Sequence, residues 1–244
     1  MSDNNDPRTE NDMDPQDIER LARRETLLKL AATGALGAGG ILGLISEALS
    51  AGSLPATPGF RRIQGPVGVD NTRASIGMNI KPGQTVMTGE GAEAVYIIGP
   101  DAFLQREKTK ITFEDNAGAQ VMRIITGKVL SVFGKGREKA RNLQLATPTA
   151  TIGIRGTGCY IEAEAARTYF CLCYGEAEAV PSGDPKQKET IRTTHHEHPI
   201  YINATGDKMM APATVINHND AELTMLENAV GRWPPFHGQS GSRY

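Results

Sequence analysis

The feature that most constrains the fold is a repeated pattern between residues 63 and 180. Short apolar runs rich in β-branched residues alternate with glycine, proline or other turn residues about every eight to twelve positions. Apolar and polar residues alternate in residues 111–113 and 128–132, which is the period of a β-strand. No helical period of useful length occurs between residues 60 and 190. The pattern predicts an all-β domain, either a mostly antiparallel roll or sandwich or a short β-solenoid.

Strands and one helix can be assigned from this pattern. The expected strands are residues 67–69, 85–88, 94–98, 103–106, 110–113, 121–125, 128–133, 143–146, 151–154, 159–164, 168–174 and 177–180. A short C-terminal helix is expected after Asn219, which fits an N-cap with Glu222 three residues later, and before Gly231. Its apolar stripe, expected to dock on the sheet, comprises Leu223, Leu226, Ala229 and Val230.

The N-terminus differs in composition from the rest of the chain. Residues 1–51 hold nine acidic and five basic residues, and residues 1–22 are too polar to form a core, so a disordered acidic tail is expected there. In residues 23–51, Arg23 and Arg24 precede an uncharged glycine-rich run, and small residues follow it. This order resembles a bacterial twin-arginine (Tat) signal peptide with a signal helix. An uncleaved membrane anchor is the alternative.

Several stretches, in order, resemble a FecR-type domain. The stretches are residues 65–69, 80–89, 94–96, 99–101, 125–133, 147–158 and 174–176. The most specific is residues 147–158, TPTATIGIRGTG, which is similar to the TP-to-RGT motif of that family. The resemblance covers roughly residues 65–180. It divides the chain into a FecR-like β domain at residues 60–182 and a C-terminal extension at residues 183–244.

The resemblance implies a β domain in the periplasm of a Gram-negative bacterium. It also implies a binding or sensing role, with an envelope protein or a cell-surface component as partner. In FecR itself the domain follows a cytoplasmic anti-sigma region and a membrane span. The 22 polar residues before the arginine pair are not expected to supply that region, so sigma-factor regulation is not carried over. If the signal is an uncleaved anchor, the domain is tied to the inner membrane and faces the periplasm.

The TPTATIGIRGTG stretch predicts a structural corner. Pro148 removes a strand donor, and Gly156 and Gly158 bracket Thr157, which favours a tight bend after residues 151–154. Arg155 could anchor the bend through hydrogen bonds from its guanidinium group. The alternative is that Arg155 and Thr157 bind a ligand.

The three cysteines are Cys159, Cys171 and Cys173. If residues 165–167 form a three-residue hairpin loop, Cys159 pairs with Cys173, and all three sulfurs share one face of the sheet. Three interpretations then stay open: a disulfide from Cys159 to Cys173 or to Cys171, buried thiols used as small hydrophobic groups, and a thiolate metal site. An odd number of cysteines leaves at least one thiol unpaired in a monomer.

All five histidines lie within the last 50 residues. If the segment before Pro199 is a strand, His196 and His198 point the same way and offer two imidazole ligands, next to His195. The third ligand would be His218 or Asp220, and the sulfurs of the cysteines could complete a mixed site. The alternative is an exposed polar loop.

The sequence predicts a non-catalytic protein. No serine sits in a nucleophile-elbow pattern, and no cysteine is paired with a base in a known catalytic order. A net charge of −2 argues against nucleic-acid binding, and membrane contact is expected only through the signal or anchor. We therefore expect an exported binding or sensing domain that needs no cofactor. The alternative is a metal-binding or redox-responsive periplasmic protein that holds a divalent metal.

Overall fold

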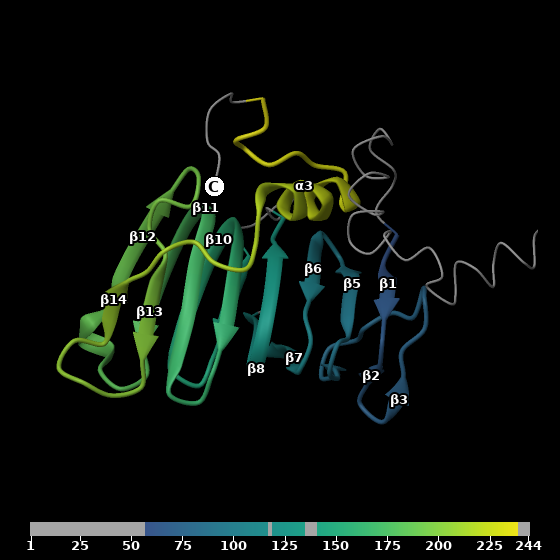
Figure 1. Ribbon diagram of the computed structural model, residues 1–244, viewed down its shortest axis with the longest axis horizontal. Helices are drawn as coiled ribbons and strands as arrows, with labels where there is room; N and C mark the ends of the chain where they lie inside the picture. The colour runs from purple at the N-terminus through teal and green to yellow at the C-terminus, as the bar shows by residue number, and fades with distance from the viewer. Residues whose placement is uncertain (1–56, 117–118, 135–140, 239–244) are drawn as a thin grey trace, which may run out of the picture. The chain divides into compact units, whose positions relative to one another are not determined.

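The computed structural model describes residues 57–116, 119–134 and 141–238, which belong to one compact unit (Figure 1). The predicted acidic tail and the predicted signal or anchor lie outside the described residues. Within the described residues, no helix is long and apolar enough to cross a membrane.

The described strands form one continuous hydrogen-bonded sheet (Figure 1). The strands are β1 (Gly59–Gln64), β2 (Val67–Val69), β3 (Thr72–Arg73), β4 (Thr85–Thr88), β5 (Glu93–Ile98), β6 (Asp101–Gln105), β7 (Thr109–Asn116), β8 (Ala119–Val132), β9 (Asn142–Ala146), β10 (Ala150–Ala163), β11 (Arg167–Pro181), β12 (Glu189–Thr193), β13 (Ile200–Asn203) and β14 (Met210–Pro212). The main path runs β14-β13-β11-β10-β9-β8-β7-β4-β2-β3. Pairing among the described strands is antiparallel except between β8 and β9. The predicted all-β class is confirmed.

Three strands of the structure are longer than predicted, and each contains a glycine with a positive φ angle. Six of the predicted strands merge in pairs into β8, β10 and β11, because Gly127, Gly156 and Gly175 have positive φ angles within continuous strands. The pairing register shifts between Arg155 and Gly158, so the predicted corner is a β-bulge and not the end of a strand. Strands β1, β3, β12, β13 and β14 were not predicted, because they are short or lack a clear apolar alternation.

The main core lies on one face of the sheet. Tyr96 is fully buried there, with ring centroids 5.3 Å from Phe60 and 5.2 Å from Phe103. Its hydroxyl donates a hydrogen bond to the buried side chain of Gln105. The same core cluster includes Cys159 and Leu172. Gln105 in turn donates hydrogen bonds to the carbonyls of Val86 and Thr109, so this buried polar side chain has partners.

Strands β6, β8, β10 and β11 are also apolar on the opposite face, which we call the outer face. Leu104, Leu130, Tyr160 and Cys171 lie side by side in register across these four strands, and each is fully buried. None of them belongs to the main core cluster. A second layer must therefore cover the outer face.

Part of that layer is the helix labelled α3 (Asp220–Ala229). A short 3₁₀ turn, η1 (Pro185–Gln187), lies earlier in the C-terminal extension, between β11 and β12. Helix α3 packs against β6 and β8 (Figure 1). Asn219 and Glu222 form a reciprocal capping box, and Gly231 follows the helix with a positive φ angle. The predicted C-terminal helix, its cap and its docking on the sheet are confirmed.

Candidate metal centre

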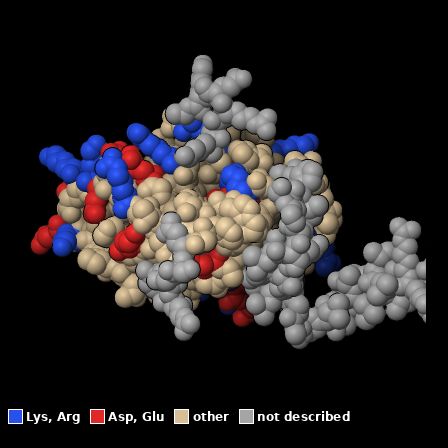
Figure 2. Space-filling model, turned by 90° about the horizontal axis from the view of Figure 1, so that it is seen from above, with Lys and Arg blue, Asp and Glu red and all other residues tan. Residues whose placement is uncertain are grey.

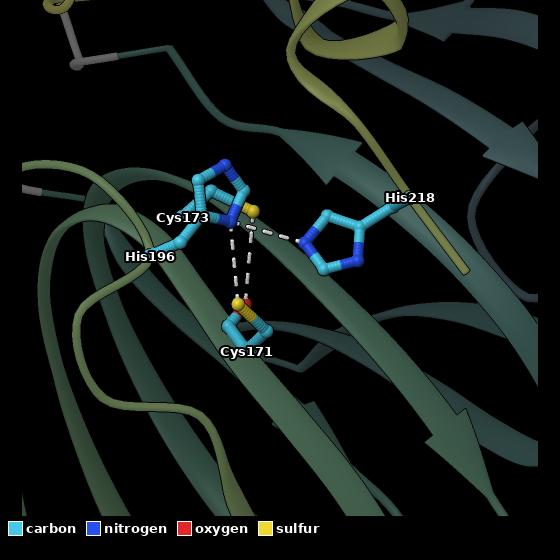
Figure 3. A group of neighbouring side chains, drawn as sticks. All are labelled: Cys171, Cys173, His196 and His218. Atoms are coloured by element: carbon cyan, nitrogen blue, oxygen red, sulfur yellow. Dashed lines mark hydrogen bonds between the residues drawn. The ribbon is translucent and has the colours of Figure 1, made fainter. Parts of the chain in front are cut away.

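Four buried side chains converge on the outer face (Figure 3). Strand β11 supplies Cys171 and Cys173, the loop between β12 and β13 supplies His196, and the residue before the α3 cap is His218. One potential ligand atom from each lies within 4.8 Å of the other three. We call these four residues the Cys–His cluster.

Strand periodicity places the two thiols. Cys171 and Cys173 alternate with Leu172, whose side chain belongs to the main core, so both sulfurs point to the outer face. Tyr160 pairs with Cys171 across the hairpin and is buried beside it. The β10–β11 hairpin therefore builds the floor of the cluster.

A tight turn places His196. Its backbone has φ +57°, an uncommon value for a residue that is not glycine, and its N–H donates to the carbonyl of Cys173 at 3.0 Å. The carboxylate of Glu197 accepts hydrogen bonds from the backbone N–H groups of Thr194 and His195, which closes the turn. Burial acts to raise the pKa of Glu197, but the hydrogen bond from the Thr194 hydroxyl, and then those from backbone N–H groups, lower it to about 2. The turn directs the His196 ring at the sulfurs.

His218 is fixed from two sides. Its ring stacks on Tyr160 with a centroid distance of 4.6 Å and an interplanar angle of 19°. Its Nδ1 lies 2.6 Å from the carbonyl oxygen of Ile216. A carbonyl only accepts hydrogen bonds, so Nδ1 of His218 carries the hydrogen, and Nε2 of the neutral ring carries a lone pair.

The same reasoning fixes the tautomer of His196. Its Nε2 lies 3.2 Å from the carboxylate of Asp220, which only accepts hydrogen bonds when ionised, so Nε2 carries the hydrogen. The lone pair of the neutral ring is then on Nδ1. This atom lies 3.1 Å from Nε2 of His218 and 3.4 Å from the sulfur of Cys171. When both rings are neutral, Nδ1 of His196 and Nε2 of His218, two nitrogen atoms that can ligate a metal ion, face each other beside a thiol.

A bound cation would accept the lone pairs of both neutral rings. Ligating histidines usually donate their other ring N–H to a carbonyl or a carboxylate, which is the arrangement of His218 and His196. A tetrahedral zinc ion, about 2.3 Å from sulfur and about 2.0–2.1 Å from nitrogen, places neighbouring ligand atoms about 3.3–3.8 Å apart. The distances of 3.1 Å and 3.4 Å lie close to those edges.

The pKa values of the cluster favour a ligating thiolate. Hydrogen bonding from Cys173, and then from His196 and His218, holds the pKa of Cys171 well below its ordinary value, although burial opposes this. Burial, and then the neighbouring Cys171, raises the pKa of Cys173. Burial lowers the pKa of His196, but Cys171 and Asp220 outweigh it, so the net shift is upward. Cys171 is thus the sulfur most ready to bind a metal, since the thiolate is the ligating form.

The predicted disulfide is wrong. All three cysteines are free thiols, and Cys159 pairs with Leu172 instead of Cys173. Four residues, not three, separate the paired Ala163 and Thr168 at the hairpin tip, and this shift of one residue turns Cys159 into the main core. The sheet thus separates Cys159 from the other two sulfurs. Burial raises its pKa, as expected for an inert thiol.

A disulfide between Cys171 and Cys173 also conflicts with the strand. Residues two apart on one face of a strand lie about 6.6 Å apart, whereas the β-carbons of a disulfide lie about 3.8 Å apart. The two thiols can share a metal ion at that spacing without a change in the backbone. Strand geometry therefore favours the metal interpretation over a bridge.

The other predicted histidine ligands lie around the cluster. The predicted strand before Pro199 is a loop, so His196 and His198 do not point the same way, and His198 is exposed. His195 lies 2.9 Å from the carboxylate of Asp220 and packs on Phe236 with a centroid distance of 4.5 Å. Asp220 orients His196 through its Nε2 instead of completing the four-residue set.

Arg155 and Thr157 do not form a joint site. The Arg155 side chain is 81% exposed and 3.8 Å from Glu176, so it does not anchor the bend as predicted. Figure 2 shows charged side chains gathered at the β12 end of the molecule, where Glu176 also pairs with Arg192. Thr157 is fully buried, and its hydroxyl has no hydrogen-bond partner among the described residues. Arg155 therefore lies in solvent, whereas Thr157 lies inside the protein.

Sequence reasoning missed the residues that support the ligands. These are Tyr160, which stacks on His218, and Ile216, whose carbonyl fixes the tautomer of His218. The correct hairpin loop length would have placed Tyr160 opposite Cys171. No sequence pattern indicates a backbone carbonyl as a partner.

Comparison with known proteins gives a distant structural likeness. No protein-family model and no curated protein matches the chain. Crystal structures of a candidate anti-sigma factor from Parabacteroides distasonis, at 1.65 Å and 2.50 Å resolution, are similar to it with a TM-score of 0.44 and 12% identity. The match covers 53% of this chain and 59% of that chain. A likeness at this level carries no argument about function.

Proposed function

We propose that this chain is a non-catalytic β module that binds one divalent metal ion of the zinc class through its Cys–His cluster. The convergence of Nδ1 of His196 and Nε2 of His218, 3.1 Å apart, on two rings whose other nitrogens face hydrogen-bond acceptors supports this most directly. The FecR-like motifs support a sensing role outside the cytoplasm for the same module.

The charge and number of the ligands favour such an ion. Two thiolates and two neutral imidazoles carry two negative charges, which a divalent ion neutralises in a site closed to water. Mixed sulfur and nitrogen ligands in tetrahedral order are typical of zinc. Catalytic zinc sites keep one position open for water or substrate, whereas four protein ligands leave none. The site therefore supports binding, and not metal-assisted hydrolysis.

Cobalt and zinc titration of the reduced, metal-free full chain tests the proposal. We expect one Co(II) per chain, with the thiolate-to-cobalt charge-transfer absorption and the strong visible bands of a tetrahedral site. Zn(II) should displace the cobalt and remove both signals. Cys171→Ala and Cys173→Ala should each weaken the charge-transfer absorption.

Cys159→Ala is the matched control. It also removes one buried thiol from the β10–β11 hairpin, but from the core face, so the stoichiometry and the spectrum should not change. No bound cobalt or zinc, or the same loss of signal in Cys159→Ala as in Cys171→Ala, would refute the proposed site.

A further inference from the structure

The outer face is covered by a segment that is not part of the sheet. Residues 213–238, which we call the C-terminal segment, follow β14 and contain α3. No residue of this segment pairs as a strand with the described sheet. Leu223 and Leu226 of α3 are fully buried, as are Leu104 and Leu130 of the strands beneath it.

Side-chain hydrogen bonds at several points hold the C-terminal segment to the rest of the protein, among them Asn217 to the carboxylate of Glu162 and Arg232 to the carbonyl of Pro100. Arg106 donates to the carbonyl of Asn217 at 2.9 Å and to the carboxylate of Glu222 at 2.8 Å. Tyr169 donates to the carbonyl of Thr214 at 2.9 Å. Tyr174, on β11, contacts Glu227. Without a strand ladder, such a segment can undock while the sheet stays folded.

The Cys–His cluster is divided between the sheet and this segment. Cys171 and Cys173 belong to β11, and the backbone N–H of His196 is hydrogen-bonded to Cys173. His218 is the ligand that the C-terminal segment contributes, and it lies two residues before α3 begins. A metal ion in the cluster would therefore connect the segment to the sheet through His218.

We propose that metal binding controls the docking of the C-terminal segment on the outer face, an inference that rests on the proposed function. With the metal bound, His218 holds the segment down and α3 covers the apolar row of β6 and β8. Without the metal, His218 is held by its 3.1 Å contact with Nδ1 of His196 and by stacking on Tyr160, which together are weaker than a bond to a metal ion. Undocking uncovers an apolar sheet face, the kind of surface that a sensing module presents to a partner.

The shift in docking depends on how much more tightly the metal ion binds the docked state than the undocked state. The undocked state keeps three of the four ligands, so the metal shifts docking by the ratio of the four-ligand to the three-ligand affinity. Loss of a group that only orients a ligand already lowers metal affinity by about 10–100-fold. Loss of the ligand itself should cost at least as much. We expect undocking to become at least about tenfold rarer when the metal binds.

Amide hydrogen exchange on the full chain, in Zn(II) and in EDTA, measures this shift. The amides of α3 should exchange at least about tenfold more slowly with zinc, while those of β10, in the sheet, should not change by a comparable factor. Trp233 provides a second signal, because it is the single tryptophan of the chain, belongs to the C-terminal segment and is 49% exposed. Its fluorescence should change on zinc addition.

His218→Ala separates the possible outcomes. This variant should bind zinc more weakly through three ligands, and its α3 exchange should be the same in zinc and EDTA. One zinc per chain with unchanged α3 exchange in the wild-type chain would overturn the docking inference and leave the metal site intact. Absence of zinc binding to the wild-type chain would overturn both the metal site and the docking inference. These two results come from the wild-type chain, so they do not depend on whether the variant folds.

Discussion

Replacement of Asp220 by asparagine tests the orientation of His196. The Asp220 carboxylate lies 3.2 Å from Nε2 of His196 and 2.9 Å from Nε2 of His195. Asparagine has the same shape, but it is neutral and offers one acceptor oxygen, so it holds the His196 ring less firmly and makes it a weaker donor to the metal. Loss of such a partner lowers metal affinity by about 10–100-fold. Because the Asp220 side chain is 38% exposed, water screens its charge, and we expect about tenfold, or about 1.4 kcal/mol.

The assay is competition for Zn(II) against a chromophoric chelator. Asp220 is also the first residue of α3, where loss of an acidic group costs about 0.3–1 kcal/mol of helix stability, so the affinity for metal and not the melting temperature must be compared. His195→Ala is the control, because it removes the other ring from the same carboxylate and should leave zinc affinity within twofold. An Asp220→Asn variant with unchanged zinc affinity would refute the tautomer assignment of His196, and with it the choice of Nδ1 as the ligand atom.

Three further predictions concern the fold, the ligand set and export. Gly127→Ala should lower the free energy of unfolding by about 2–4 kcal/mol, because φ at Gly127 is +97° and the new β-carbon would overlap Thr109 of β7. Gly153→Ala, which has open space around the new β-carbon, should be neutral or stabilise by up to about 1 kcal/mol. Equal stability of the two variants in thermal or urea unfolding would contradict the bulged strand. His198→Ala should leave zinc affinity unchanged, because His198 is exposed and lies outside the Cys–His cluster. A tenfold loss of affinity would show that His198 is a ligand. Arg23→Lys with Arg24→Lys should keep the precursor in the cytoplasm in cell fractionation, and normal export would refute the Tat prediction.

The sequence predicted the fold better than the site, for a physical reason. Strand periodicity is local, so β2 and β4 were predicted with their observed ends, and the capping box of α3 depends on residues three apart. The hairpin register was lost because residues 164–167, EAAR, contain no glycine, asparagine or proline that selects a loop length. A slip of one residue was enough to move Cys159 to the other face.

The approach of His218 to Cys171 depends on tertiary structure that no local pattern contains. The two residues are 47 positions apart, and the chain between them passes through the rest of β11, η1, β12, β13 and β14. Their approach also requires the docking of α3 on the sheet. The sequence could indicate only that sulfur and imidazole ligands were present in the right number. It could not exclude His198, because the strand predicted for that segment is a turn with His196 at φ +57°.

Burial of the thiols would protect them in the oxidising compartment that the predicted export implies. In an oxidising compartment an exposed pair of thiols is converted to disulfides, and a lone thiol forms bridges between chains. Here the sheet keeps Cys159 apart from the other two, and the spacing of Cys171 and Cys173 along β11 disfavours a bridge between them. Both sulfurs are buried, and His218 of the C-terminal segment lies beside them on the outer face. If undocking of the C-terminal segment exposes Cys171 and Cys173, metal loss and thiol oxidation should proceed together from the undocked state.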